Sequence, residues 1–169
     1  MAYIVEGMKL IPQTMTMSCW YASAQMLVHW KMEQKQQSFR DLIPPELDAQ
    51  CAKIRDDNGG IVNPQILQMA KRIGLEYIPP LSPTPEALED WLKQYGPLWV
   101  NGKSHIVVIA GIAKIPFLGH CLKVYDPAPV NVGKIDWRSL EHWYAMGNSV
   151  STRDTGADVE TVFLHCPDF

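Results

Sequence analysis

The sequence has 169 residues and a mass of 19.1 kDa, a size that predicts one domain, 1–169, rather than two independent domains. Hydrophobic residues make up 47% of the chain and charged residues 20%, which excludes a disordered or fibrous protein. The 15 basic and 18 acidic residues give a net charge of −3, and the basic residues are scattered, so we expect no nucleic-acid partner. We also expect no membrane partner, because the apolar run 106–113 is too short to span a bilayer.

Four segments carry helix signals. Residues 19–35 are apolar nearly all round, which predicts a central helix that is buried on most sides. Residues 63–74 and 84–96 each begin with Asn or Thr followed by proline, show an apolar stripe at helical spacing and end at glycine. Similar spacing predicts a further helix over 136–147.

The second half of the chain predicts strands instead. Four segments are rich in β-branched residues. They are residues 98–100, 105–113, 121–125 and 160–164. A proline-rich stretch, 79–85, connects the two halves. The predicted fold is therefore α+β, with a helical half, about 1–95, packed through its central Cys-bearing helix on an antiparallel β-sheet half, about 96–169.

Cys19 is the residue of greatest chemical interest in the helical half. It lies at the first turn of the expected buried helix, where unpaired backbone N–H groups and the helix dipole favour negative charge on the sulfur. A thiolate is the nucleophilic form of cysteine. Gln13, six residues earlier, is close enough for its amide to bind a developing oxyanion together with the Cys19 N–H.

His105 and Asp126 complete a possible catalytic set. His105 opens the most apolar strand, where its imidazole can act as general base and acid for a thiol. Asp126 ends the next strand, so a hairpin would let it reach the far ring nitrogen of His105 and fix the tautomer. The order Cys, His, Asp excludes caspase-type enzymes, in which the histidine comes first.

This set resembles the papain-like cysteine proteases. Gln13 precedes Cys19 at their spacing, the segment 19–23 (Cys-Trp-Tyr-Ala-Ser) is similar to their Cys-Trp-x-x-Ser signature, and Asn58-Gly59-Gly60 resembles their Asn-Gly-Gly segment. The compact length and the Ser104-His105 segment are similar to small bacterial members, namely bacteriocin-leader peptidase domains and secreted effector or toxin proteases.

The resemblance implies a thiol peptidase that cleaves a protein substrate through an acyl-enzyme on Cys19 and needs no cofactor or metal. It further implies that substrate backbone lies along Gly59 and Gly60, and we expect Trp20 and Trp99 to line the substrate cleft. It points to a toxin or effector domain acting in the cytoplasm of a recipient cell, with a cognate immunity protein that covers the cleft. The first ten residues hold no signal-peptide core, which fits a dedicated secretion system and equally a plain cytoplasmic protease.

Two other functions use the same residues. A peptidoglycan amidase or an acyl transferase would use the same Cys-His-Asp site on a different amide, and a non-catalytic domain would only bind peptides. The remaining cysteines form no C-x-x-C pair, which argues against a zinc ribbon or a thioredoxin motif. We expect Cys51, Cys121 and Cys166 to be free thiols that serve packing.

Overall fold

The computed structural model describes six stretches of the chain, and all statements below concern these. They are residues 2–36, 49–61, 63–78, 84–101, 105–140 and 162–167. Residues 79–83 of the predicted connector, 79–85, and residues 141–147 of the predicted last helix lie outside them.

Three of the four predicted helices are confirmed. Helix α1 spans Cys19–Gln34, α3 spans Asn63–Ile73 and α4 spans Pro85–Tyr95. At the start of α4 the Thr84 side chain accepts a hydrogen bond from Ala87 N (3.1 Å), as its sequence position predicts. Helix α2, Ala49–Asp56, lies in a segment for which the sequence patterns predicted no element.

The strands form one antiparallel sheet of seven, in the order β2-β7-β3-β4-β5-β6, with β1 also paired to β4. The strands predicted from β-branched residues are all present, although residues 160 and 161 lie outside the described stretches. They are β3 (Leu98–Asn101), β4 (Ile106–Ile115), β5 (Gly119–Asp126) and β7 (Phe163–His165).

The first half of the chain also contributes two strands that were not predicted, β1 (Ala2–Ile4) and β2 (Glu76–Ile78). Strand β4 is long enough to pair with β3 along its first half and with β1 along its second. The sheet is therefore not confined to the C-terminal half, because short strands from the helical half extend it.

The predicted helix over 136–147 is wrong at its start, where strand β6 (Lys134–Ser139) pairs antiparallel with β5. Its apolar residues Ile135 and Trp137 alternate with Asp136 and Arg138, which is a two-residue period. Pairing with β5 gives the backbone N–H and C=O groups of this segment their hydrogen-bond partners, so no helix is needed to supply them.

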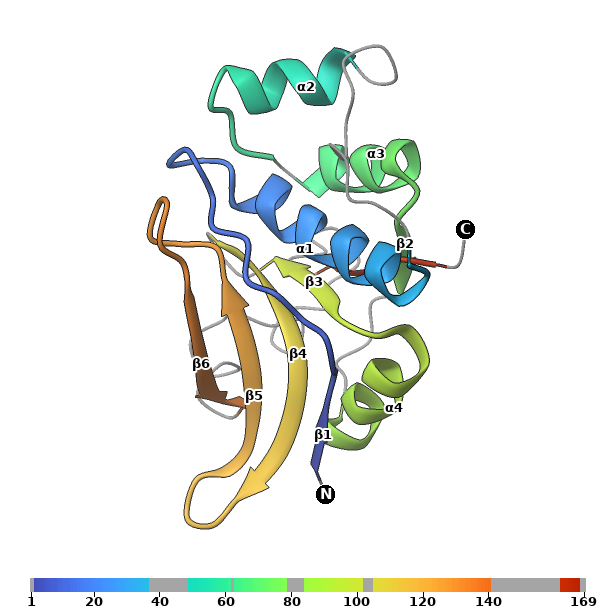
Figure 1. The fold of residues 1–169 in the computed structure, drawn as a ribbon, viewed down its shortest axis with the longest axis vertical. Helices are drawn as coiled ribbons and strands as arrows, with labels where there is room; N and C mark the ends of the chain where they lie inside the picture. The colour runs from blue at the N-terminus through green and yellow to red at the C-terminus, as the bar shows by residue number, and fades with distance from the viewer. Residues whose placement is uncertain are drawn as a thin grey trace.

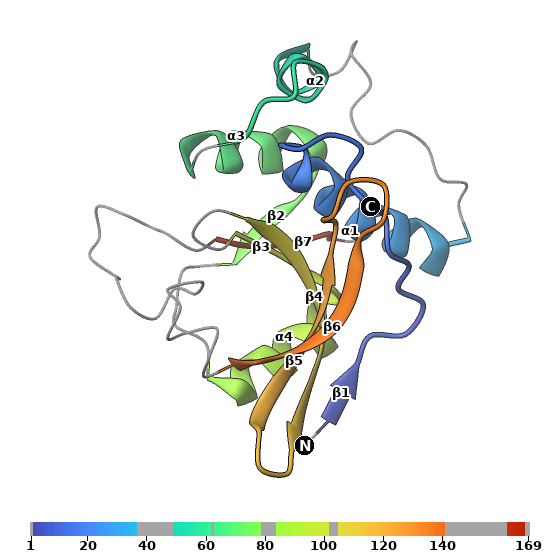
Figure 2. The same cartoon turned by 90° about the vertical axis from the view of Figure 1, so that its left-hand side faces the viewer.

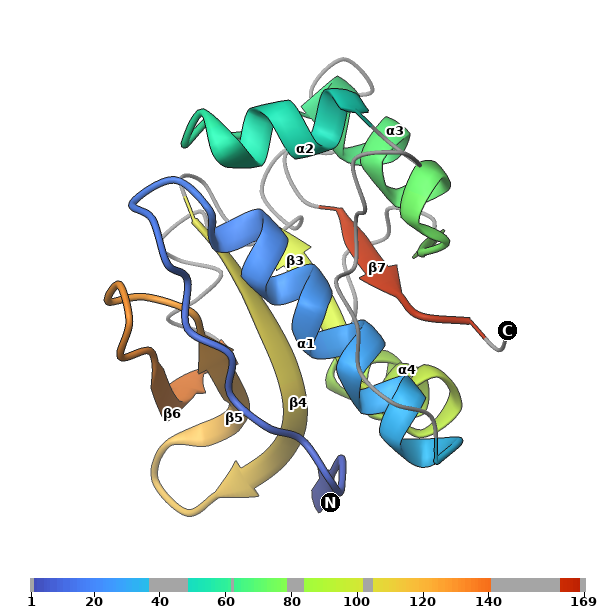
Figure 3. The same cartoon turned by 45° about the horizontal axis from the view of Figure 1, so that its top comes forward.

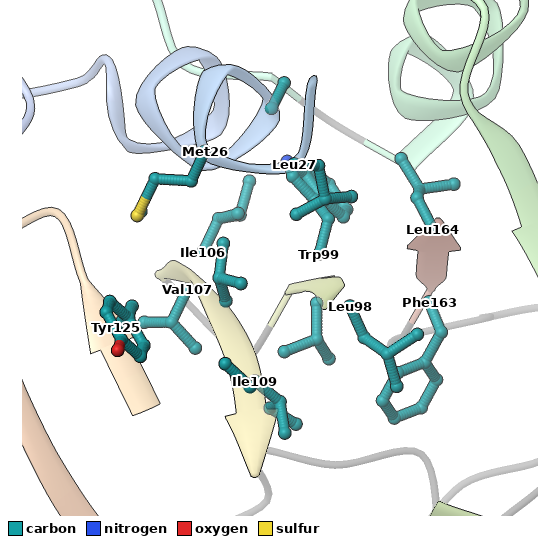
Figure 4. Packing of buried hydrophobic residues seen from close by; sticks show 14 of the residues in the cluster. Met26, Leu27, Leu98, Trp99, Ile106, Val107, Ile109, Tyr125, Phe163 and Leu164 are labelled. Atoms are coloured by element: carbon teal, nitrogen blue, oxygen red, sulfur yellow. The ribbon is translucent and has the colours of Figure 1, made fainter. Parts of the chain in front are cut away.

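Helix α1 crosses β3 and β4 (Figure 3), while α2 and α3 lie together at one end of the molecule (Figures 1 and 2). Residues 20–24 and 26–28 of α1 are buried, so apolar contacts surround the helix as its composition predicts. Met26 and Leu27 extend from α1 toward the sheet (Figure 4). This burial holds the N-terminus of α1 in a fixed position against β3 and β4.

Candidate active site

Cys19 is the first residue of α1 and is half-buried. The preceding residue, Ser18, makes no side-chain cap; its hydroxyl instead donates to Met15 O (3.1 Å) and accepts from Met15 N (3.2 Å). The positive end of the helix dipole is therefore directed at the residue that carries the sulfur.

His105 and Asp126 come together because β4 and β5 are antiparallel, so the start of one lies beside the end of the other. His105 Nε2 donates a hydrogen bond to Asp126 Oδ1 over 2.5 Å. This bond, and the interaction of the ring with the Cys19 side chain, outweigh burial and raise the pKa of His105 to about 9. Since Nε2 is used by Asp126, Nδ1 is the ring nitrogen left for Cys19. Cys19, His105 and Asp126 are thus brought together, with the His105 ring interacting with both the thiol and the carboxylate.

The Asp126 carboxylate accepts two further hydrogen bonds. Ala128 N donates to Oδ1 (2.9 Å) and Arg138 Nη2 donates to Oδ2 (2.8 Å). Burial acts to raise the pKa of Asp126, but the bonds from His105, Arg138 and Ala128 outweigh it and hold the pKa below its usual value. Arg138 was not predicted as a site residue. The sequence signal that could have found it is the alternation of polar and apolar residues along β6, which puts Arg138 on the same strand face as Asp136.

Gln13 is buried and tied to this site through its backbone. Its N–H donates to the carbonyl of Pro127 (2.9 Å), the residue that follows Asp126. Its own carbonyl accepts from Asn131 N (2.8 Å), in the turn between β5 and β6. Its side-chain Nε2 donates to Met15 O (2.9 Å) and Thr16 O (3.0 Å). Both amide hydrogens are therefore used within the loop that leads to Cys19, and a bond to an oxyanion would require one of them to change partner.

The Asn58-Gly59-Gly60 segment lies beside the same loop. Asn58 Oδ1 accepts from Met17 N (2.9 Å), and its Nδ2 donates to Thr16 Oγ1 (3.0 Å). Gly60 is so close to the loop that a Cβ there would be 2.8 Å from the Met17 methyl. The two glycines predicted to contact substrate are therefore adjacent to the residues that precede the thiol.

Trp20 and Trp99 are not placed as expected. Both side chains are 0% exposed, so neither indole lines a surface that a substrate contacts. Trp20 Nε1 donates to Gly59 O (3.0 Å), and Trp99 Nε1 donates to Trp20 O (3.0 Å). The expectation of a cleft-lining role is replaced by one in which the two rings hold α1, β3 and the glycine segment together.

The other cysteines lie apart from this chain of residues. Cys121 and Cys166 are buried, and the side chain of Cys51 lies outside what the structure describes. Among the described residues, no group of three or more His, Cys, Asp or Glu side chains is arranged to hold a metal ion. Within the same stretches, no helix has the length and apolar character needed to cross a membrane.

A family model described as papain-like cysteine protease AvrRpt2 matches residues 5–145, which include Gln13, Cys19, His105 and Asp126. No curated protein sequence matches the chain. Among solved structures, the chain is similar to the crystal structure of UfSP from C. elegans, with a TM-score of 0.61 and 13% sequence identity. The similarity covers 99% of this chain and 34% of that one, so the chain spans about a third of its length. The predicted α+β, papain-like fold is confirmed.

Proposed function

The chain belongs to the AvrRpt2 family of papain-like cysteine proteases, and we propose that it cleaves peptide bonds of protein substrates through an acyl-enzyme on Cys19. It is thus a cysteine peptidase, a hydrolase. The observation that carries the assignment of Cys19 is that His105, hydrogen-bonded to Asp126, also interacts with the thiol at the start of α1.

In the proposed reaction the Cys19 sulfur attacks the carbonyl carbon of the substrate, and His105 holds the thiol proton. The tetrahedral intermediate collapses, the C–N bond breaks, and His105 gives this proton to the leaving amine. Water then attacks the thioester while His105 accepts a proton, the C–S bond breaks, and His105 returns the proton to the thiolate. The products are a carboxylic acid and an amine, and no group is oxidised or reduced.

The oxyanion in this proposal is bound by the Cys19 N–H and by Gln13. Because the Gln13 amide donates to Met15 O and Thr16 O, substrate binding would exchange one of these bonds for the oxyanion. The same loop is held by Gln13, so one residue both shapes the segment before the thiol and supplies a donor to the reaction.

We assign contact with the substrate backbone to Gly60 rather than to Gly59. The Gly59 N–H donates to Ile54 O (2.7 Å), and the Gly59 carbonyl accepts from Trp20 Nε1, so both backbone groups of Gly59 are used within the protein. Gly60 is exposed. Substrate residues beside the scissile bond would pair with its backbone, as a strand pairs with a sheet edge.

We further propose that the chain acts as an effector or toxin inside a recipient cell and that a cognate immunity protein covers the site in the producing cell. Support comes from the family, whose namesake AvrRpt2 is a bacterial effector protease. Growth of a bacterial host should then stop when the chain is produced in its cytoplasm and continue with Cys19→Ala.

The test of the peptidase assignment combines labelling with a search for cleavage products. An epoxide inhibitor of thiol proteases should add to Cys19 in the chain and in Cys121→Ser, a change at a buried thiol, but not in Cys19→Ala. Discrete new protein termini in the host should appear with the first two and not with the third. Labelling without new termini, combined with growth arrest only on export to the periplasm, would point to a cell-wall amide instead.

A further inference from the structure

Arg138 joins two carboxylates at the edge of the sheet. On β6 its Nη2 donates to Asp126 Oδ2 (2.8 Å) and its Nε donates to Asp136 Oδ1 (2.9 Å). The Arg138 side chain is 30% exposed, and that of Asp126 is 12% exposed. A half-buried guanidinium with two carboxylate partners is fixed in both position and plane, because its donors point in set directions.

The hydrogen bonds of Asp126 divide between its two oxygens. Oδ1 accepts from His105 and from Ala128 N, and Oδ2 accepts from Arg138. If Arg138 were removed, the described contacts would hold the carboxylate at Oδ1 alone, and rotation about the Cβ–Cγ bond would move that oxygen relative to His105.

We propose that Arg138 is a positioning residue of the peptidase site, which fixes the Asp126 carboxylate in the plane that orients the His105 ring toward Cys19. The inference rests on the proposed function of Cys19 and His105. Arg138 acts through Asp126: its side-chain hydrogen bonds go to Asp126 and Asp136, so its role differs from those of Cys19 and His105, which take part in the reaction itself.

Lysine would not replace Arg138 fully. A single ammonium is a point charge, whereas the fork of Arg138 reaches Asp126 and Asp136 from two different nitrogens. Lys134 cannot serve as a control, because it pairs with Asp126 across the two strands and lies 3.3 Å from Asp136 Oδ2. Lys114, an exposed residue of β4 that pairs with His120, is a better control, since its replacement removes a positive charge from the same sheet at a residue that pairs with neither Asp126 nor Asp136.

Two possible roles of Arg138 predict opposite changes in His105. If Arg138 acted only by its charge, its removal would take a positive charge away from the neighbourhood of His105, and the pKa of His105 would rise. If Arg138 positions Asp126, its removal weakens the Asp126–His105 bond, and the ring loses its proton at lower pH. A purely structural clamp between β5 and β6 would leave the titration of His105 unchanged.

The experiment compares the full chain with Arg138→Gln, Arg138→Lys and Lys114→Gln. NMR titration of the His105 ring reports its pKa without any need for activity, and kcat and KM for a cleaved peptide are measured at each pH. We expect Arg138→Gln to lower kcat at least about tenfold with little change in KM, and to move the His105 pKa from about 9 toward about 6.5. Arg138→Lys should restore part of both, and Lys114→Gln should match the unchanged chain.

The proposal is overturned if folded Arg138→Gln titrates like the unchanged chain or at higher pH. Should Arg138→Gln fail to fold, Arg138→Lys decides, since a lower His105 pKa in that variant supports positioning and an unchanged one opposes it. An unchanged chain that cleaves no peptide refutes the proposed function, while the NMR titration still tests Arg138 by itself.

Discussion

The Trp99 indole on β3 donates its Nε1–H to the carbonyl oxygen of Trp20, 3.0 Å away, on the residue that follows the thiol. Trp20 in turn donates its own indole N–H to Gly59 O. Two buried aromatic side chains thus connect the sheet, the start of α1 and the glycine segment in one sequence of contacts. The position of Cys19 therefore depends on packing in the core as well as on the helix that begins with it.

Trp99→Phe tests this connection. The change leaves the Trp20 carbonyl without its indole donor and should lower the free energy of unfolding by about 1–3 kcal/mol. KM for a cleaved peptide should not change at temperatures where the variant is folded, because the ring is fully buried. Urea unfolding and steady-state kinetics check both parts. An increase in KM without loss of stability would restore the cleft-lining role first expected for Trp99.

Asp126→Asn tests the carboxylate beside His105. An amide offers no charge-assisted bond, so the pKa of His105 should fall from about 9 toward its ordinary value of about 6.5. Since His105 must carry a proton to give to the leaving amine, the alkaline limb of kcat/KM should shift to lower pH, with kcat reduced at least about tenfold. Glu86→Gln, at an exposed residue in the first turn of α4, serves as control. An alkaline limb that stays near pH 9 would contradict the role of Asp126.

The helices with clear end signals could be predicted from sequence, whereas several strands could not. Helix α4 has Thr84 before it and Gly96 after it, and these act on the local backbone whatever surrounds them. Strands β1 and β2 have only three residues each, so their conformation depends on distant partners in β4 and β7. Strand β6 carries the exposed apolar residues Ile135 and Trp137, which make its alternation difficult to distinguish from a helical stripe.

A similar division holds for the candidate site. Cys19, His105 and Asp126 were expected together because each lies at an end of a helix or strand, and a hairpin between consecutive strands brings two of them together. Arg138 could not be placed while its segment was interpreted as a helix. The burial of Trp20, and the use of the Gln13 amide by backbone carbonyls, depend on three-dimensional contacts that no local pattern encodes.

The raised pKa of His105 also makes stability depend on pH. In the folded chain the ring keeps its proton up to about pH 9, whereas in the unfolded chain it loses it near pH 6.5. The folded state binds more protons between these values, so this contribution is full below pH 6.5 and is lost as the pH rises through about 9. The ring is 35% exposed, and solvent screening should make the effect smaller than the shift alone implies.

Urea unfolding of the chain and of His105→Gln at pH 6, 7.5 and 9.5 measures this contribution. The difference in unfolding free energy between the two should shrink as the pH rises, because other titrating groups cancel in the comparison. A difference that is constant over this range would show that the folded and unfolded chains hold the His105 proton equally well.

Gly96 should resist substitution for two separable reasons. Its backbone angles, φ +83° and ψ −149°, lie in a region essentially restricted to glycine, and an added Cβ would lie 2.4 Å from the Trp30 ring on α1. Gly74→Ala is a matched control, because Gly74 has a φ of +80° but nothing within 4 Å of an added Cβ. We expect thermal unfolding to show a loss of about 1–2 kcal/mol for Gly74→Ala and a further 1–3 kcal/mol or so for Gly96→Ala. Equal losses would mean that Trp30 moves aside freely.

Gln13→Ala separates the two roles proposed for this side chain. A lost oxyanion donor should lower kcat for peptide cleavage by about 10²–10³, whereas alkylation of Cys19 by iodoacetamide develops no oxyanion and should slow by less than about threefold. Loss of the bonds to Met15 O and Thr16 O would instead misplace the loop before the thiol and slow both reactions alike. Thr14→Ala, at the exposed neighbouring residue, should change neither rate. Because alkylation and cleavage share the thiol but only cleavage needs the donor, the ratio of the two rates decides whether the buried amide of Gln13 turns from the loop to the substrate.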